Sequence, residues 1–213
     1  LHENRAEGCT TMAMDMAASN GYLDIIQWLH IYRTEGCTTR AMDIATLNGH
    51  LDIVKYLHKY RTEGCNSWAM DWAAKNGHLE MIQWLHHNRT EGCSTWAMNW
   101  AAKNGHIHIV QWLHLYRTEG CSHIAMKYAV EYGHINIIKF LHENLNVKVD
   151  DNTMIKAMSN GNIDIIKYLH KNIPECHNNI PMDIAAMNGY MDMVQFLHEN
   201  NIGECTINAM DMA

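Results

Sequence analysis

Several features that define large classes of proteins are missing from this sequence of 213 residues. Lys and Arg number 16 against 23 Asp and Glu, the net charge is −7, and the basic residues are spread along the chain. Because a phosphate-binding surface needs a concentrated basic patch, we expect no nucleic acid partner. No apolar run approaches the roughly 18 residues of a membrane span, so we expect no membrane insertion. With no initiator Met, signal peptide or transit segment, we predict a cytoplasmic, not a secreted, protein.

Catalytic signatures and domain boundaries are missing as well. The sequence contains no nucleophile elbow, no phosphate loop and no Cys-x2-Cys pair, and no carboxylate pair stands apart from its repeats. We therefore expect no enzymatic activity, no metal and no cofactor. No linker, low-complexity tract or composition break interrupts the chain, so we predict that residues 1–213 form one domain.

Repetition is what the sequence has in abundance. The stretch NGHLEMIQWLHHNRTEGC from Asn76 returns 28 residues earlier as NGHLDIVKYLHKYRTEGC and 28 residues later as NGHIHIVQWLHLYRTEGC. Its glycine recurs at 21, 49, 77, 105, 133, 161 and 189, and the Leu-His pair occurs eight times. A fixed period of this size indicates a solenoid, here of seven repeats plus a partial one. We interpret the chain as a fragment of a longer array.

Each repeat predicts two helices, helix A and helix B, followed by the loop RTEGC. Helix A carries an apolar stripe such as Ala13, Met14 and Ala17, and ends at the recurring glycine, where a left-handed residue is cheapest. Helix B, at about residues 22–31 of the first pair, has a broad apolar surface, so each pair must be buried by its neighbours. The predicted helix A caps are Thr10, Thr38, Asn66, Ser94, Ser122, Asp150, Asn178 and Thr206.

The text of helix A and its turn resembles the ankyrin repeat, whose core reads T-P-L-H-x-A-A-x-x-G-H. The best match is IPMDIAAMNGYMDMVQFL from Ile180, and AMDWAAKNGHLEMIQWL from Ala69 matches nearly as well. Two departures are that the family's histidine is mostly Asp here and that the unit has 28 residues against about 33. The resemblance, together with the short RTEGC loop, implies an all-α, ankyrin-like helical-pair solenoid with short loops in place of β-hairpin fingers.

The text NGHLDIVKYLHKYRTEGC is also similar to ankyrin proteins of amoebae and of the giant DNA viruses that infect them. High Asn, Ile, Lys and Met with only two Pro fits an AT-rich genome of that kind. The resemblance implies a location in the host cytoplasm, or in a virion if the protein is viral.

Most of the 16 histidines and seven cysteines occupy fixed repeat positions. A catalytic base needs a unique environment, so we interpret the Leu-His and Gly-His columns as structural and expect the Leu-His ring to bond carbonyls at the end of helix B. Successive packed helices lie about 8–10 Å apart, too far for disulfides, so we expect reduced, buried thiols. The aromatic column of helix B is interpreted as core, and Trp72 and Trp100 as packing between repeats.

The loop residues Arg33, Arg61, Arg89 and Arg117 alternate with Glu35, Glu63, Glu91 and Glu119. One interpretation is a row of charges available to a partner. The other, which we favour, is an Arg–Glu ladder between neighbouring loops that cancels its own charge.

Two columns of helix A vary in residue type between repeats, one near its start and one near its end. A scaffold position should prefer one residue type, whereas a contact position is free to vary, and exposed Trp in a row is typical of a binding hot spot. For the tryptophans, partner contact and local packing both remain open. The predicted contact residues are Arg40, Trp68 and Trp96 in the first column, and Leu47, Lys75, Lys103 and Glu131 in the second.

From these patterns we predict a non-catalytic scaffold for protein–protein recognition that binds another protein along the concave surface of the A helices. The alternative is a structural, self-assembling repeat protein whose copies stack end to end, as in a filament or a virion component, because head-to-tail contacts do not close.

Overall fold

The computed structural model describes residues 9–149, 151–173 and 182–202, and all regular secondary structure in those residues is helical. This confirms the all-α prediction. The helices, in chain order, are α1 (Met12–Ser19), α2 (Leu23–Tyr32), α3 (Thr39–Asn48), α4 (Leu51–Tyr60), α5 (Trp68–Lys75), α6 (Leu79–Asn88), α7 (Thr95–Lys103), α8 (Ile107–Tyr116), α9 (His123–Glu131), α10 (Ile135–Leu145), α11 (Asp151–Ser159), α12 (Ile163–Asn172), α13 (Met182–Met187) and α14 (Met191–Glu199).

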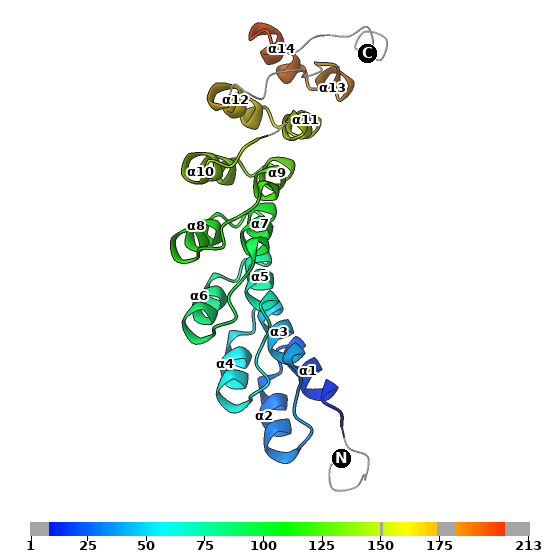
Figure 1. The fold of residues 1–213 in the computed structure, drawn as a ribbon. Helices are drawn as coiled ribbons and strands as arrows, with labels where there is room; N and C mark the ends of the chain where they lie inside the picture. The colour runs from blue at the N-terminus through cyan, green and yellow to red at the C-terminus, as the bar shows by residue number, and fades with distance from the viewer. Residues whose placement is uncertain (1–8, 150, 174–181, 203–213) are drawn as a thin grey trace.

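The helices form two columns that run side by side along a curved molecule (Figure 1). The odd-numbered helices are the predicted A helices and lie on the inner side of the curve, while the even-numbered B helices lie on the outer side. Each odd-numbered helix packs on the next one along the column, and these contacts are denser than those between successive even-numbered helices. We call the inner side, made by the outward surfaces of α1 to α13, the concave face.

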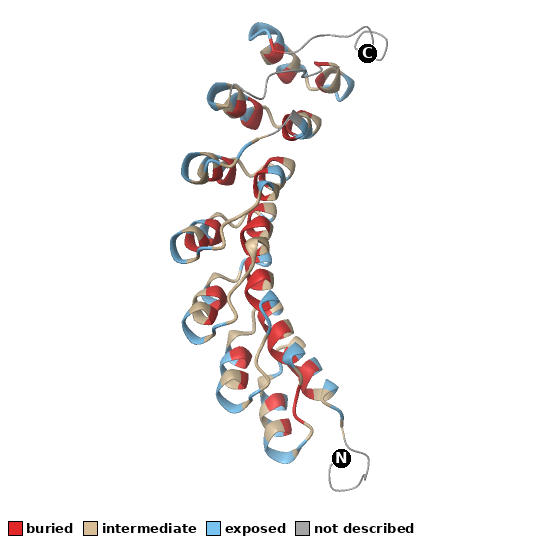
Figure 2. Ribbon diagram, in the orientation of Figure 1, coloured by how far each residue is buried: buried red, intermediate tan, exposed pale blue. Residues whose placement is uncertain are grey.

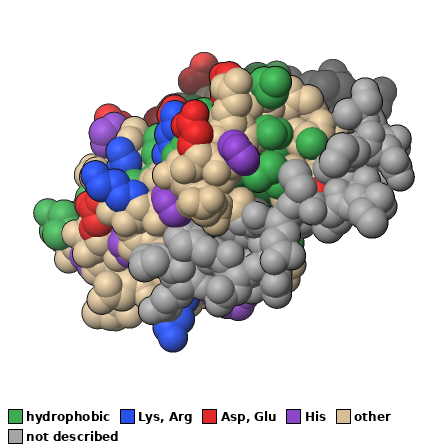
Figure 3. All heavy atoms as spheres, turned by 90° about the horizontal axis from the view of Figure 1, so that it is seen from above, with side chains coloured by type: hydrophobic (Ala, Val, Ile, Leu, Met, Phe, Trp, Pro, Cys, Tyr) green, Lys and Arg blue, Asp and Glu red, His purple; other side chains and the backbone are tan. Residues whose placement is uncertain are grey.

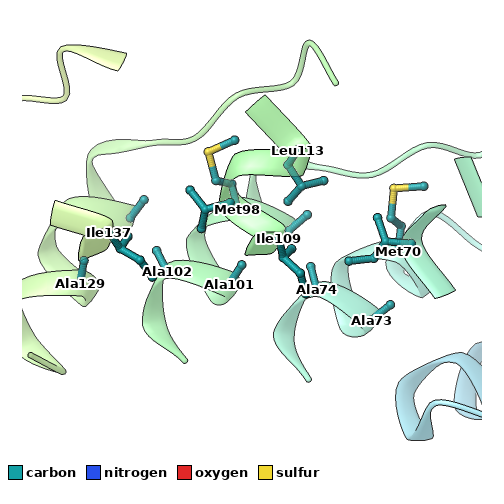
Figure 4. Close-up of a cluster of buried hydrophobic side chains, with 14 of the residues drawn as sticks. Met70, Ala73, Ala74, Met98, Ala101, Ala102, Ile109, Leu113, Ala129 and Ile137 are labelled. Atoms are coloured by element: carbon teal, nitrogen blue, oxygen red, sulfur yellow. The ribbon is translucent and has the colours of Figure 1, made fainter. Parts of the chain in front are cut away.

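The curvature follows from the size of the buried residues. Successive A helices meet through Ala73, Ala74, Ala101 and Ala102, which are fully buried and let the backbones approach closely (Figure 4). The B helices contribute bulky core residues such as Ile and Leu, which hold their neighbours further apart. The core lies between the two columns, and the outer sides of the even-numbered helices are exposed (Figure 2).

The turn from helix A to helix B is in close contact with a histidine ring of the next repeat. Gly77 has a φ of +85°, and a Cβ atom there would lie 2.9 Å from Cε1 of His106 in the following repeat. The same ring bonds through Nε2 to the carbonyl oxygen of Lys75 at 3.1 Å, and Asn104 Nδ2 donates to that oxygen at 2.9 Å. The Gly-His column is therefore structural: its ring lies on a glycine and helps to satisfy the end of helix A in the repeat before.

A buried carboxylate bonds the starts of α3, α5 and α7 to the repeat before. Asp71 is 1% exposed, and its two oxygens accept from Ser94 N at 2.8 Å and Ser94 Oγ at 2.6 Å. Asn99 makes a similar pair of bonds: its Oδ1 accepts from Ser122 N at 3.1 Å, and its Nδ2 donates to Ser122 Oγ at 2.9 Å. The position at which ankyrin repeats have histidine is thus used here for bonding between repeats.

The predicted helix caps are largely confirmed. Thr38, Ser94 and Ser122 accept from the backbone N–H two residues later, and Asn66 Oδ1 accepts from Trp68 N at 2.8 Å. Helix α1 differs, because it begins at Met12 without a side-chain cap bond. The predicted caps Asp150, Asn178 and Thr206 lie outside the described residues.

The RTEGC loops contain no strand, as predicted for a chain without β-hairpin fingers. Their ion pairs, however, form within each loop and not between neighbouring loops: Arg33 binds Glu35 through two nitrogens, and the pattern repeats. The hydrogen bond from Arg33 holds the pKa of Glu35 at about 2. Neighbouring loops are joined in another way: the backbone N–H of Cys37 donates to Oε1 of Glu63 in the next loop at 3.4 Å, and a Cβ on Gly64 would lie 2.7 Å from Nη2 of Arg89 in the loop after it. The Arg and Glu charges of the loops cancel as predicted, but each pair does so within its own loop.

In the described part of the chain, His58 and His86 do not bond the carbonyls at the end of helix B, contrary to our prediction. His86 instead meets the ring of Trp112 in the next repeat edge to face, at 5.2 Å between centroids, and its Nδ1 lies 3.3 Å from Nη1 of Arg117. His58 repeats both contacts with Trp84 and Arg89. These histidines are structural, but they act between repeats and not as helix caps.

The described cysteines at the repeat position are free thiols that pack in or beside the core. Burial raises the pKa of Cys65 to about 11 and that of Cys93 to about 12. Since the thiolate is the reactive form, these thiols are unreactive at neutral pH.

Replacing Asp71 tests the carboxylate bond between repeats. Asp71→Ala leaves the N–H and hydroxyl of Ser94 without their acceptor, so the free energy of unfolding should fall by about 1–3 kcal/mol, measured by urea denaturation followed by circular dichroism. Asp71→Asn is the matched control, because Asn99 already makes both bonds in the next repeat. A loss as large in the Asn variant as in the Ala variant would show that the charge, and not the bond pair, matters.

Two histidines predict a loss of stability in mild acid. Burial, and then the charge of Arg117, lowers the pKa of His86, and burial also lowers the pKa of His106. The unfolded chain, with a histidine pKa of about 6.5, then takes up protons first as the pH falls, so the folded state loses stability below that value. The thermal midpoint should drop between about pH 7.5 and about pH 5.5, a window chosen to bracket that pKa.

His86→Gln serves as the comparison, because glutamine does not titrate, and its midpoint should change less across the same window. Burial raises the pKa of Asp43 and Asp71, so these groups act in the opposite direction as the pH falls. Equal slopes for the two proteins would contradict the assignment to His86.

Candidate protein-binding face

All seven predicted contact residues lie on odd-numbered helices, and none of them is buried. The first column, with Arg40, Trp68 and Trp96, lies in the first turns of its helices. The second column lies at the opposite ends of α3, α5, α7 and α9. The structure thus places the two sets at the two ends of the A helices. The second set is Leu47, Lys75, Lys103 and Glu131.

Four tryptophans form a connected aromatic row across α5 and α7. Trp68 lies 6.4 Å from Trp72 on its own helix and 6.1 Å from Trp100 on the next, measured between ring centroids. Trp96 lies 5.4 Å from Trp100. We call these four residues, Trp68, Trp72, Trp96 and Trp100, the tryptophan row.

The row faces away from the core. In α5 the buried side consists of Ala69, Met70, Asp71, Ala73 and Ala74, whereas Trp68, Trp72 and Lys75 follow one another at the spacing of a single helical face. Trp68 is 46% exposed, and the other three rings of the row are half-buried. The rings pack on one another and still present their other sides to solvent.

Two lysines lie over neighbouring aromatic rings. The ammonium of Lys75 lies 5.5 Å from the ring centroid of Trp100, and that of Lys103 lies 5.1 Å from both Tyr128 and Tyr132. Each contact crosses from one repeat to the next, and Lys75 thereby links the second predicted column to the tryptophan row. Such contacts contribute about 0.5–1 kcal/mol at exposed sites.

A shallow hollow of about 570 Å³ lies at the ends of α3, α5 and α7. Leu47 and Lys75, two of the predicted contact residues, contribute to its wall. Its other lining residues belong to the Asn-Gly-His turns, namely Asn48, Asn76, His78, Asn104 and His106. Many of their donors are used internally, as in the bonds to the carbonyl of Lys75. The hollow therefore offers shape and one cation more than it offers free hydrogen bonds.

The surface around the predicted contact residues contains further aromatic rings. Trp72 and Trp100 were interpreted as packing between repeats, and Trp100 does contact Trp68 of the preceding repeat, but both rings are also part of the half-exposed row. Tyr128 and Tyr132 were not singled out at all. Position is the signal that identifies Tyr128, because Trp72, Trp100 and Tyr128 lie four residues after the first variable column and so share its helical face. Tyr132 lies four residues further on.

Charges elsewhere on the molecule are mixed. Seen from the end that carries α14, basic and acidic side chains lie among one another without a broad field of one sign (Figure 3). In the described part of the chain, no group of three or more His, Cys, Asp or Glu side chains is arranged to hold a metal ion. None of the helices within these residues is long and apolar enough to cross a membrane.

Comparison with known proteins identifies the fold. A family model described as "Ankyrin repeats (3 copies)" matches residues 14–95, 70–153 and 128–211. No curated protein matches the sequence. The crystal structure of the human ASB11 ankyrin repeat domain resembles this one with a TM-score of 0.60 at 18% sequence identity, covering 75% of this chain and 83% of that one. The predicted ankyrin-like fold with shortened units is thus confirmed, and the chain belongs to the ankyrin repeat family.

Proposed function

We propose that this protein recognises another protein along its concave face and that the tryptophan row is the centre of the contact. Ankyrin repeats are generally scaffolds for protein–protein interaction, and the family is typically non-catalytic. The prediction that this chain has no enzymatic activity agrees with that tendency. Its location, in the cytoplasm or in a virion, stays a prediction from the sequence.

The observation that carries the proposal is the exposed tryptophan at the start of α5. Trp68 is 46% exposed at a repeat position where Arg40 and Ile124 also occur, so the scaffold does not require a large ring there. Tryptophan and arginine are the residues most enriched among binding hot spots. A surface of four linked tryptophans with little rotamer freedom loses little entropy when a partner orders it.

Local packing is the competing explanation for these rings, because each touches at least one other. Ring pairs contribute about 0.5–1.5 kcal/mol beyond area burial, so packing alone would account for some of their presence. It does not account for why Met12 and Arg40 occupy the same position in the two preceding repeats, both exposed. A test must therefore remove the rings without unfolding the array.

Two substitutions taken from the protein's own repeats provide that test. Trp68→Ile and Trp96→Ile both copy Ile124, so the introduced residue is one that the scaffold accepts at this position and adds no charge. The full chain is used to select binders from a displayed peptide library, and the affinity of selected peptides is measured by fluorescence anisotropy. The double variant should weaken binding at least about thirtyfold, which corresponds to the loss of about 2 kcal/mol at a hot spot.

The matched control removes exposed apolar side chains from the B helices. Ile31→Ala with Leu115→Ala alters residues that are 68% and 73% exposed at the ends of α2 and α8, and it should leave affinity unchanged. Thermal midpoints of both variants are measured alongside. Binding that survives the tryptophan changes but is lost in the control would place recognition elsewhere and end the proposal.

The first described repeat favours a second candidate function, the end-to-end stacking of copies. Ile25 of α2 is 48% exposed, whereas its counterparts in the following three repeats, Ile53, Met81 and Ile109, are at most 2% exposed. Tyr22 beside it is 55% exposed. If copies stack, a second copy covers these side chains. Contacts of that kind do not close and would produce filaments.

Light scattering behind size exclusion tests the stacking candidate. If copies stack, the mass should rise in open-ended steps as the concentration increases, and Ile25→Glu should return it to that of one chain, because a buried unpaired charge is costly. The control is Leu115→Glu, an exposed position on the outer side of α8. A constant mass of one chain at every concentration would remove stacking from consideration.

A further inference from the structure

We infer that the concave face from α3 to α9 takes an acidic segment of its protein partner, one with aromatic or aliphatic side chains between its carboxylates. This inference rests on the proposed function and names the class of partner.

The accessible charges of this face have the opposite sign to the whole chain. On the described odd-numbered helices from α1 to α9, the carboxylates of Asp15, Asp43 and Asp71 are buried and bonded to helix starts, which leaves Glu131 as the accessible anion. The accessible cations on the same helices are Arg40, Lys75, Lys103 and Lys127. Within a chain of net charge −7, the face is therefore locally positive.

No carboxylate of the described residues neutralises the ammonium groups of Lys75 and Lys103. Among the described residues, the ion pairs are those between Arg and Glu of the RTEGC loops, so no described carboxylate pairs with Lys75 or Lys103. Each ammonium lies over an aromatic ring and keeps donors directed elsewhere. A carboxylate arriving at the ring edge meets a cation whose position is already restricted.

A role at the helix ends alone does not explain these lysines. Both lie in the last turn of their helices, where a cation complements the helix dipole. Yet the carbonyl of Lys75 already accepts from Asn104 and His106. The ammonium of Lys75 instead extends to Trp100 on the next helix, where it borders the tryptophan row.

The spacing of the cations limits the shape of the partner. Lys75 and Lys103 occupy the same position in consecutive repeats, and packed helices lie about 8–10 Å apart. Three residues of a chain in the polyproline II conformation span about 9 Å and bring the side chain back to the same face. An acidic residue at every third position would therefore meet successive lysines, and the apolar residues between would pack on the tryptophans. At the following repeat Glu131 reverses the sign, so the acidic stretch should end there.

A single-stranded nucleic acid also stacks on aromatic rings beside cations. The observations favour a peptide, because accessible cations occur about once per repeat on this face and the chain as a whole is negative. A polyanion would be repelled over most of the molecule.

The experiment reverses the two lysine charges. Peptides selected on the full chain should be enriched in Asp and Glu together with aromatic or aliphatic residues. Lys75→Glu with Lys103→Glu should weaken their binding at least about tenfold, and added salt should weaken the wild-type complex. The control is Lys55→Glu with Lys59→Glu on α4, where both lysines are exposed and Lys59 also lies over a ring, that of Tyr60. That variant should change the affinity less than about twofold, as expected of charges outside the contact.

The outcomes separate the two proposals. Peptides that depend on Trp68 and Trp96 but are neutral or basic, or that ignore the lysine reversal, overturn the acidic partner and leave recognition by the concave face standing. Peptides indifferent to the tryptophans, or the absence of any binder, contradict both. An oligothymidine probe that binds more tightly than the peptides and depends on the same lysines would assign the face to nucleic acid.

Discussion

Contact between neighbouring repeats is the constraint on which the rest of this structure depends. Neither helix of a pair can bury its apolar surface within its own repeat, so every repeat is completed by the next. The polar contacts obey the same rule: Asp71 holds the start of the next helix A, His106 closes on the glycine before it, and His86 meets the next aromatic ring. The side chains most often repeated in the sequence are therefore those that join one repeat to another.

The period predicted much of this arrangement, because a residue that returns every 28 positions must meet the same surroundings each time. It predicted the helical pairs, the glycine turns, the caps and the strand-free loops. It did not predict which side chains contact one another. A column of Arg and Glu looks the same whether each pair forms within a loop or between loops, and the structure decides for the former. The Leu-His rings were misassigned for the same reason, since their partner lies 26 residues away on the next helix B.

The candidate site was predicted in part, and the limit was again physical. Variation between repeats identified Trp68, Trp96, Lys75 and Lys103, because a position that tolerates several residue types is not held by the core. Variation could not identify Trp72 and Trp100, whose position is apolar in most repeats and so looks like core. Only the packing shows that this apolar position lies on the outward side of helix A, where the four tryptophan rings meet and the ammonium group of Lys75 lies over Trp100.

Lys127 occupies the position at which earlier repeats have an acceptor for the next helix start. An ammonium has donors only, so the tie made by Asp71 and Asn99 cannot be continued by this residue. In an array whose stability is a sum of neighbour terms, unequal interfaces divide the chain into blocks that open separately. We expect the boundary between α9 and α11 to be such a division, the point at which the array first yields under tension. The repeats before it, which carry the tryptophan row, would then stay folded as a unit while those after it fray.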